Sequence, residues 1–140
     1  MHSEVDIYNE SMRYIDNAKE ILSTKAGKHG DYYQDRKYVK MASHTAYCGL
    51  LYAFDGLLKY KGIEKPKKRN KSRDAVSVDF YREQLGKMNR SVLDKFNETV
   101  YPNLHELGGY DGVLDVDTIQ RGIKTAIELI EWVRKQISKK

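Results

Sequence analysis

The sequence has few of the residues that cross-link or interrupt a chain. Its 140 residues include one cysteine, Cys48, which excludes a disulfide within the chain and a metal cage of thiolates. Only Pro66 and Pro102 are prolines, and scarce proline favours long helices because an interior proline removes a backbone hydrogen bond. No apolar run is long enough to span a bilayer, and the N-terminus does not resemble a signal peptide. We therefore expect a cytoplasmic protein without membrane contact.

The sequence also lacks the short motifs that mark common catalytic classes. It contains no glycine-rich phosphate loop, no Gly-x-Ser-x-Gly nucleophile turn and no paired-cysteine zinc pattern. We therefore predict no catalytic residue, no resident metal and no cofactor.

Apolar residues instead recur at steps of three and four residues in four long segments, while no segment alternates with the period of a strand. The segments start near residues 3, 31, 77 and 117. Pro102 is expected to break or kink the third, and residues 103–107 to add a short helical turn. Asp117 and Gln120 resemble a capping box for the last segment. The pattern predicts an all-α single domain over residues 1–140, an antiparallel up-and-down four-helix bundle with an extra short helix.

Two of these segments carry the strongest apolar patterns. The last has a nearly coiled-coil seam: Val116, Ile119, Ile123, Ala126, Ile130, Val133 and Ile137. The second is apolar nearly all round from Ala46 to Phe54, which is typical of a central helix enclosed by neighbours. Together with Tyr52 and Trp132 it offers more apolar surface than one bundle covers, so we expect a homo-oligomer. In the first segment the predicted inward stripe includes Val5, Tyr8, Met12, Ile15 and Leu22.

The positive charge is concentrated in one stretch. Lys61–Arg73 has seven Lys or Arg and one acid, whereas the remainder of the chain has 18 basic and 19 acidic residues. Like charges repel and bury little, so we expect a mobile basic loop at about residues 62–76. Its cations could neutralise phosphates and give weak, salt-sensitive RNA contact: Lys65, Lys67, Lys68, Arg69, Lys71 and Arg73. The alternative is a solvated connector, because no aromatic residue interleaves the cations within the loop.

A second group of candidates lies on the second segment. Steps of four and seven residues place His44, Cys48 and Asp55 on one helical face. The candidate polar site consists of Arg36, His44 and Asp55. The alternative is a core cysteine, a flanking histidine and one hydrogen-bonded aspartate. Because an unpaired buried carboxylate is costly, we expect Asp55 to reach the edge of the bundle or to find a partner. The candidate partners are tyrosine hydroxyls, a lysine or arginine from a neighbouring helix, and His44 of a second chain.

The order of the helices, with the second ending in Ala-Phe-Asp-Gly-Leu-Leu-Lys (Ala53–Lys59), resembles HEPN-type bundles. The resemblance implies one of three roles: an RNA-cleaving toxin, an RNA-binding module or a partner of a small nucleotidyltransferase, often as a dimer. The ribonuclease signature of the family is an arginine followed four to six residues later by a histidine. Between Arg36 and His44 there are seven residues, so no catalytic residue is transferred.

From these patterns we favour a non-catalytic, homo-oligomeric binding module that touches RNA or a protein partner. One alternative is a HEPN-like ribonuclease with a degenerate site at Arg36, His44 and Asp55. The other is a purely structural partner of another protein.

Overall fold

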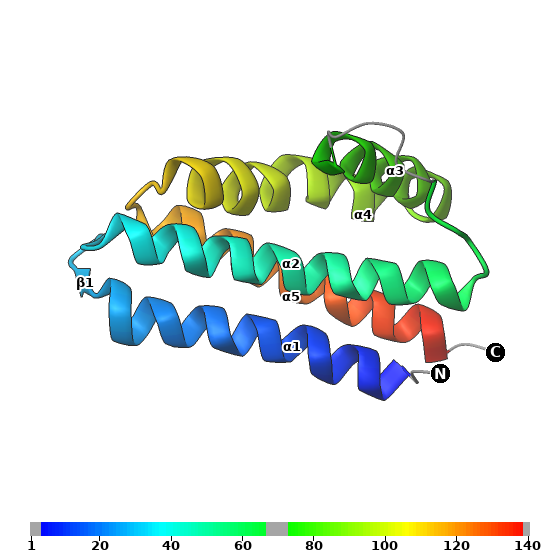
Figure 1. The fold of residues 1–140 in the computed structure, drawn as a ribbon, viewed down its shortest axis with the longest axis horizontal. Helices are drawn as coiled ribbons and strands as arrows, with labels where there is room; N and C mark the ends of the chain where they lie inside the picture. The colour runs from blue at the N-terminus through cyan, green and yellow to red at the C-terminus, as the bar shows by residue number, and fades with distance from the viewer. Residues whose placement is uncertain (1–3, 67–72, 139–140) are drawn as a thin grey trace.

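A computed structural model describes residues 4–66 and 73–138 of the chain. Helices predominate, and one short hairpin is the exception (Figure 1). In chain order the elements are α1 (Glu4–Ile21), η1 (Leu22–Ala26), β1 (Lys28–His29), β2 (Tyr32–Tyr33), α2 (Arg36–Tyr60), α3 (Arg73–Met88), α4 (Arg90–Lys95), η2 (Phe96–Asp111) and α5 (Val116–Ser138). The two η segments are π-helical and therefore wider than an α-helix. The predicted all-α class is confirmed.

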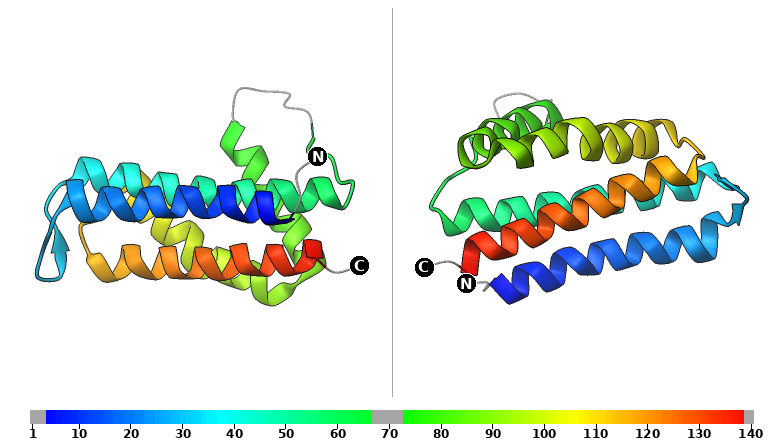
Figure 2. Two further views of the ribbon diagram at one scale, coloured as in Figure 1. Left: turned by 90° about the horizontal axis from the view of Figure 1, so that it is seen from below. Right: turned by 180° about the vertical axis from the view of Figure 1, so that it is seen from behind.

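The long helices lie side by side along one axis, and both ends of the described chain lie at the same end of the molecule (Figure 1). Helices α2 and α5 each contact α1 on one side and η2 on the other (Figure 2). α3 and α4 lie at the end of the molecule where α2 finishes, and η2 runs from there back towards the hairpin. None of the described helices is long and apolar enough to cross a membrane.

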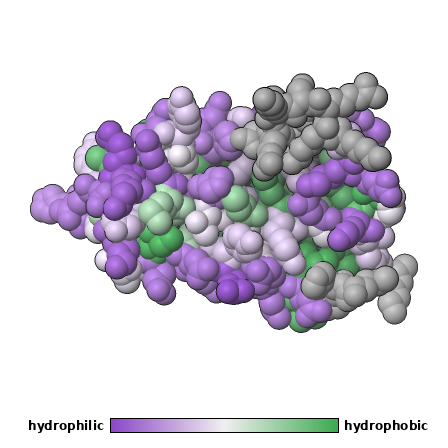
Figure 3. Space-filling model, viewed as in Figure 1, coloured by the Kyte–Doolittle hydropathy of each residue, from purple (hydrophilic) through white to green (hydrophobic). Residues whose placement is uncertain are grey.

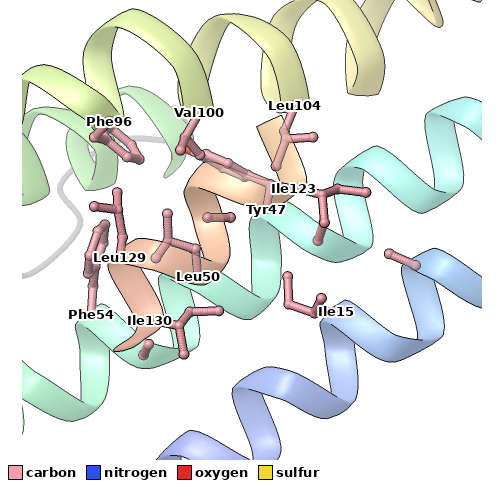
Figure 4. Packing of buried hydrophobic residues seen from close by; sticks show 14 of the residues in the cluster. Ile15, Tyr47, Leu50, Phe54, Phe96, Val100, Leu104, Ile123, Leu129 and Ile130 are labelled. Carbon is pink, nitrogen blue, oxygen red and sulfur yellow. The ribbon is translucent and has the colours of Figure 1, made fainter. Parts of the chain in front are cut away.

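The core is centred on α2, as its apolar pattern predicts. Tyr47, Leu50 and Phe54 point from α2 towards residues of η2 and α5 (Figure 4). The seam of α5 is also confirmed, because every predicted position from Ile119 to Ile137 is buried. The largest fully buried side chains come from four elements: Ile15, Val39, Leu50, Phe54, Leu57, Phe96, Val100, Leu104, Ile119, Ile123, Leu129 and Ile130.

The predicted stripe of α1 is wrong at its first position, since Val5 is 45% exposed whereas Ile7 is buried. The buried positions are Ile7, Ser11, Ile15, Ala18 and Leu22. Small residues of α2 set this phase, because Gly49 and Gly56 let α1 approach closely. A Cβ on Gly56 would stand 2.8 Å from Ile7 Cδ1, so Ile7 fills the space that Gly56 leaves.

The third predicted segment is interrupted at Asn89 and not at Pro102. The Asn89 side chain accepts a hydrogen bond from Val92 N at 3.1 Å and so caps α4 in place of a continuous helix. Pro102 lies inside η2. The wider winding pairs each carbonyl with an amide five residues later, so the missing proline amide interrupts one bond without ending the helix.

The hairpin is the element that the sequence pattern did not predict, because strands of two residues are too short to show alternation. Tyr33 N donates to Leu114 O at 2.7 Å, and Val116 N donates to Asp31 O at 3.0 Å, which ties the hairpin to the start of α5. Consequently α2 begins at Arg36, with Asp35 as its cap, and not near Asp31.

The start of α5 also differs from the prediction. Its cap is Asp115, whose carboxylate accepts from Thr118 N at 2.9 Å, whereas Asp117 pairs with Arg121 at 2.8 Å. The side-chain and backbone bonds from Thr118 hold the pKa of Asp115 below its usual range.

Glycine permits the closest approach between α2 and η2. A Cβ on Gly108 would stand 2.7 Å from the Cβ of Ser43, a fully buried residue of α2, and 2.8 Å from Asn103 O. A methyl group at this position would therefore push the two helices apart.

We predict that Gly108→Ala lowers the free energy of unfolding by about 1–3 kcal/mol, the usual cost of overpacking. The matched control is Gly86→Ala in α3, where a Cβ would meet only the flexible end of Leu93 at 3.2 Å. The control should be neutral or stabilising, because alanine favours helix over glycine by up to about 1 kcal/mol. Urea unfolding of both variants decides the matter, and equal losses in the two would refute the close-packing explanation.

Candidate functional site

Asp55, Lys65 and Tyr81 form a polar group in which each side chain contacts the other two. We call it the Asp55 group. The three residues come from the last turns of α2, the segment that follows α2, and the middle of α3. The Tyr81 hydroxyl donates to Asp55 Oδ1 at 2.5 Å, and Lys65 Nζ lies 3.2 Å from the same oxygen. Lys65 Nζ also donates to the Tyr81 hydroxyl at 3.3 Å. Two donors therefore converge on one carboxylate oxygen.

The two donors give the Asp55 carboxylate the partners that it needs in the apolar half of α2. The expected tyrosine and lysine partners are both present, although the lysine follows α2 directly instead of coming from a neighbouring helix. The side chains of Asp55 and Lys65 are 41% and 47% exposed, so their ion pair is worth less than about 1 kcal/mol. Tyr81 is only 3% exposed, so it supplies a rigid donor beneath a solvated pair.

Burial of Tyr81 and its bond to Asp55 raise the pKa of its phenol well above the ordinary tyrosine value. Burial likewise raises the pKa of Tyr33, and the hydrogen bond with Glu131 raises that of Tyr8. All three phenols therefore stay protonated in the folded chain at pH values where an unfolded chain begins to lose phenol protons.

The basic segment begins beside this group. Lys65 is its one predicted RNA-contact residue with a described side chain, and that side chain is paired with Asp55. Lys67, Lys68, Arg69 and Lys71 lie outside the described residues, and Arg73 is the first residue of α3.

Sequence reasoning missed an aromatic residue at the base of this segment. Tyr60, 52% exposed, lies between Lys59 and Lys61, which are both exposed. Tyr60 directly precedes the basic stretch Lys61–Arg73, so the pattern within that stretch does not include it.

The structure does not bring Arg36, His44 and Asp55 together. Arg36 Nε donates to Gly112 O at 3.2 Å and so holds the loop before α5. His44 Nε2 lies 3.4 Å from Cys48 Sγ one turn along α2. Arg36 and Asp55 are 19 residues apart on one helix, which is about 28 Å at 1.5 Å per residue. Arg36, His44 and Asp55 therefore each contact different partners.

An aromatic cluster that sequence reasoning also missed joins α2, α3 and η2. The rings of Tyr101 and His105 stack with centroids 4.7 Å apart, and Tyr47 meets His105 edge-on at 5.0 Å. The guanidinium of Arg82 lies 4.6 Å from the Tyr101 centroid, and its Nε donates to Asn97 at 2.9 Å. Asn97, Tyr101 and His105 follow one another at steps of four along η2, but Tyr47 and Arg82 come from other helices, so no local pattern reveals the whole cluster. Its contacts are those of a packed helical interface.

The described residues offer little to a small ligand or a metal. Within residues 4–66 and 73–138, no three His, Cys, Asp or Glu side chains are grouped as metal ligands. An apolar hollow of about 10 Å³ lies between α2 and α3, lined by Phe54, Leu57, Leu58, Tyr81, Gln84, Leu85 and Met88. Ligand pockets usually measure about 300–1,000 Å³, so this hollow is too small for a typical metabolite.

Comparison with known proteins places the chain in a family. The sequence profile of a domain of unknown function, DUF5618, matches residues 6–135. The chain belongs to the DUF5618 family. A solved structure described as a protein of unknown function from Dyadobacter fermentans is 37% identical, with a TM-score of 0.80, and the match covers 98% of this chain and 100% of that one. A search of curated proteins finds no match for this DUF5618 chain.

We predict that the folded chain loses stability as the pH rises above about 10, the ordinary tyrosine pKa. In that range phenols ionise in the unfolded chain, whereas Tyr81 stays protonated in the folded one, so alkali favours unfolding. Tyr81→Phe should reduce the slope of unfolding free energy against pH by up to about 1.4 kcal/mol per pH unit. The control is Tyr110→Phe, at a side chain that is 79% exposed, which should keep the wild-type slope. Equal slopes in all three proteins, measured by denaturant titration, would contradict the role of Tyr81.

Proposed function

We propose that this DUF5618 chain is a cytoplasmic, non-catalytic interaction module that forms a homo-oligomer and contacts RNA weakly through Lys61–Arg73. The observation that carries the proposal is the segregation of charge. Seven cations and one acid occupy this segment, while the remainder of the chain is close to neutral. A concentrated positive patch on a nearly neutral body favours a polyanionic partner over a charged small metabolite.

The surroundings of the segment support single-stranded RNA in particular. Lys59, Tyr60 and Lys61 present an exposed aromatic ring between two exposed cations where α2 ends. Bases of any sequence can stack on such a ring while phosphates meet the lysines. The contact is weak and non-specific, because phosphates carry no sequence information.

We further propose that the helices form an up-and-down four-helix bundle of HEPN-like type, in which α3, α4 and η2 together take the third position. The chain path supports this, because α1, α2, η2 and α5 alternate in direction, whereas α3 lies across them (Figures 1 and 2). The ribonuclease alternative has less support, since about 28 Å of helix separates Arg36 from Asp55 and His44 is paired locally with Cys48.

The outward side of α2 supports self-association. Met41 is 47% exposed, and the half-buried residues Thr45, Cys48 and Tyr52 follow it at steps of four, three and four. This spacing is that of a helix-packing seam. Apolar and weakly polar surface gathers over the middle of α2, with strongly polar surface around it (Figure 3). Trp132 and Tyr52 contribute less than their sequence positions suggest, because both pack partly against the core of their own chain and the Tyr52 ring stacks on Tyr14 at 6.1 Å.

We predict that replacing Lys67, Lys68, Arg69 and Lys71 together with serine abolishes binding to a single-stranded RNA oligonucleotide. The melting temperature should stay nearly unchanged, because surface substitutions usually cost within about 0.5 kcal/mol. Fluorescence anisotropy at several salt concentrations measures the binding. For the wild type, the logarithm of affinity should fall with that of salt by about 0.7 for each phosphate neutralised.

The matched control replaces four cations on exposed parts of the helical body, Lys19, Lys25, Lys124 and Lys135, with serine. It lowers the net charge by the same amount and should retain most of the binding. If both variants lose binding equally, the contact is a general charge effect. If RNA is cleaved in the binding mixtures, the non-catalytic assignment fails.

A further inference from the structure

The Asp55 group has the geometry of an occupied oxyanion site. The Lys65 ammonium and the Tyr81 hydroxyl both reach Asp55 Oδ1, at 3.2 Å and 2.5 Å. A phosphate oxygen accepts the same charge-assisted hydrogen bonds as a carboxylate oxygen. Tyr81 is buried, and its ring packs against Phe54 with centroids 6.0 Å apart, so its hydroxyl is held in place whatever anion it meets.

The site is also accessible from solvent. Asp55 and Lys65 are 41% and 47% exposed, so an external anion can reach the ammonium without opening the core. The pair stands where the basic segment leaves α2, between the exposed cation Lys61 and the start of α3. A polyanion that follows the segment therefore passes this point.

We propose that Asp55 occupies, in the free chain, an oxyanion subsite formed by Lys65 and Tyr81, and that a phosphate of bound RNA competes with Asp55 for this subsite. This inference rests on the proposed function, and it identifies Asp55 as a residue that lowers the affinity for RNA. While Asp55 neutralises Lys65, that lysine releases no counterion when RNA binds. Asp55 therefore weakens RNA binding, because it keeps Lys65 neutralised in the free chain.

The first arm of the test measures RNA affinity for Asp55→Asn, which keeps the shape of the side chain and removes its charge. The variant should bind single-stranded RNA about fivefold more tightly at low salt, the worth of one contact between unit charges near 4 Å in water. Its salt dependence should steepen by about 0.7, one additional phosphate on a single strand. The control is Asp117→Asn, which removes the same charge from the Arg121 ion pair at the opposite end of the molecule.

The second arm separates a freed subsite from a general loss of repulsion. Lys65→Ala should change affinity little in the wild type but should cancel the gain in the Asp55→Asn background. Tyr81→Phe in that background should reduce the gain as well. If Asp55→Asn and Asp117→Asn behave alike, or if the gain survives Lys65→Ala, the subsite does not exist.

Inorganic phosphate at constant ionic strength distinguishes the source of the phosphate. It should compete with RNA measurably in Asp55→Asn only at millimolar concentrations, since a single anion lacks the other contacts of the segment. If phosphate displaces RNA at micromolar concentrations, the subsite serves a free anion and the RNA assignment is overturned. Thermal melts check that each variant is folded at the assay temperature.

The result for the wild type tests the proposed function separately. If neither the wild type nor any variant binds RNA, the proposed function fails. If the wild type binds and Asp55→Asn binds no more tightly than Asp117→Asn, only the subsite fails.

Discussion

The closeness with which other helices approach α2 sets the arrangement of the whole molecule. Where α1 crosses α2, a Cβ on Gly49 would stand 2.7 Å from the Cβ of Tyr14, and Gly56 leaves the space that Ile7 fills. Where η2 crosses, Gly108 faces Ser43 with no room for a methyl group. Dense packing of this kind leaves few voids, and the hollow between α2 and α3 is accordingly far smaller than a metabolite.

Two surfaces remain on α2 after its neighbours are in place. One is the outward seam that starts at Met41, whose exposure and spacing suit a second copy of the chain. The other is the polar end, where Asp55 connects α2 to α3 through Tyr81 and to the basic segment through Lys65. The same helix thus organises the core and pairs with Lys65 of the basic segment. Membership of DUF5618 names no ligand for either surface, since that family is defined as a domain of unknown function.

The sequence predicted elements that many residues indicate together, such as a long apolar stripe. It did not predict features that depend on a single contact. The seam of α5 repeats over six turns, and the apolar run of α2 marks it as central, so both could be predicted. The break at Asn89 depends on one side-chain bond, and the hairpin depends on backbone bonds to the loop before α5. The sequence indicated that Asp55 needs partners, but choosing Tyr81 and Lys65 among many tyrosines and lysines requires the folded chain. The aromatic cluster around His105 could not be predicted either, because Tyr47 and Arg82 join it from other helices.

The proposed function makes this chain a self-associating module that holds RNA without cleaving it. Native mass spectrometry of the full chain, purified at low salt from its own cells, is the most direct test. We expect a mass that contains a whole multiple of the 16.3 kDa chain together with uncleaved RNA, which dissociates as salt is raised. A single 16.3 kDa chain that carries no RNA would contradict it.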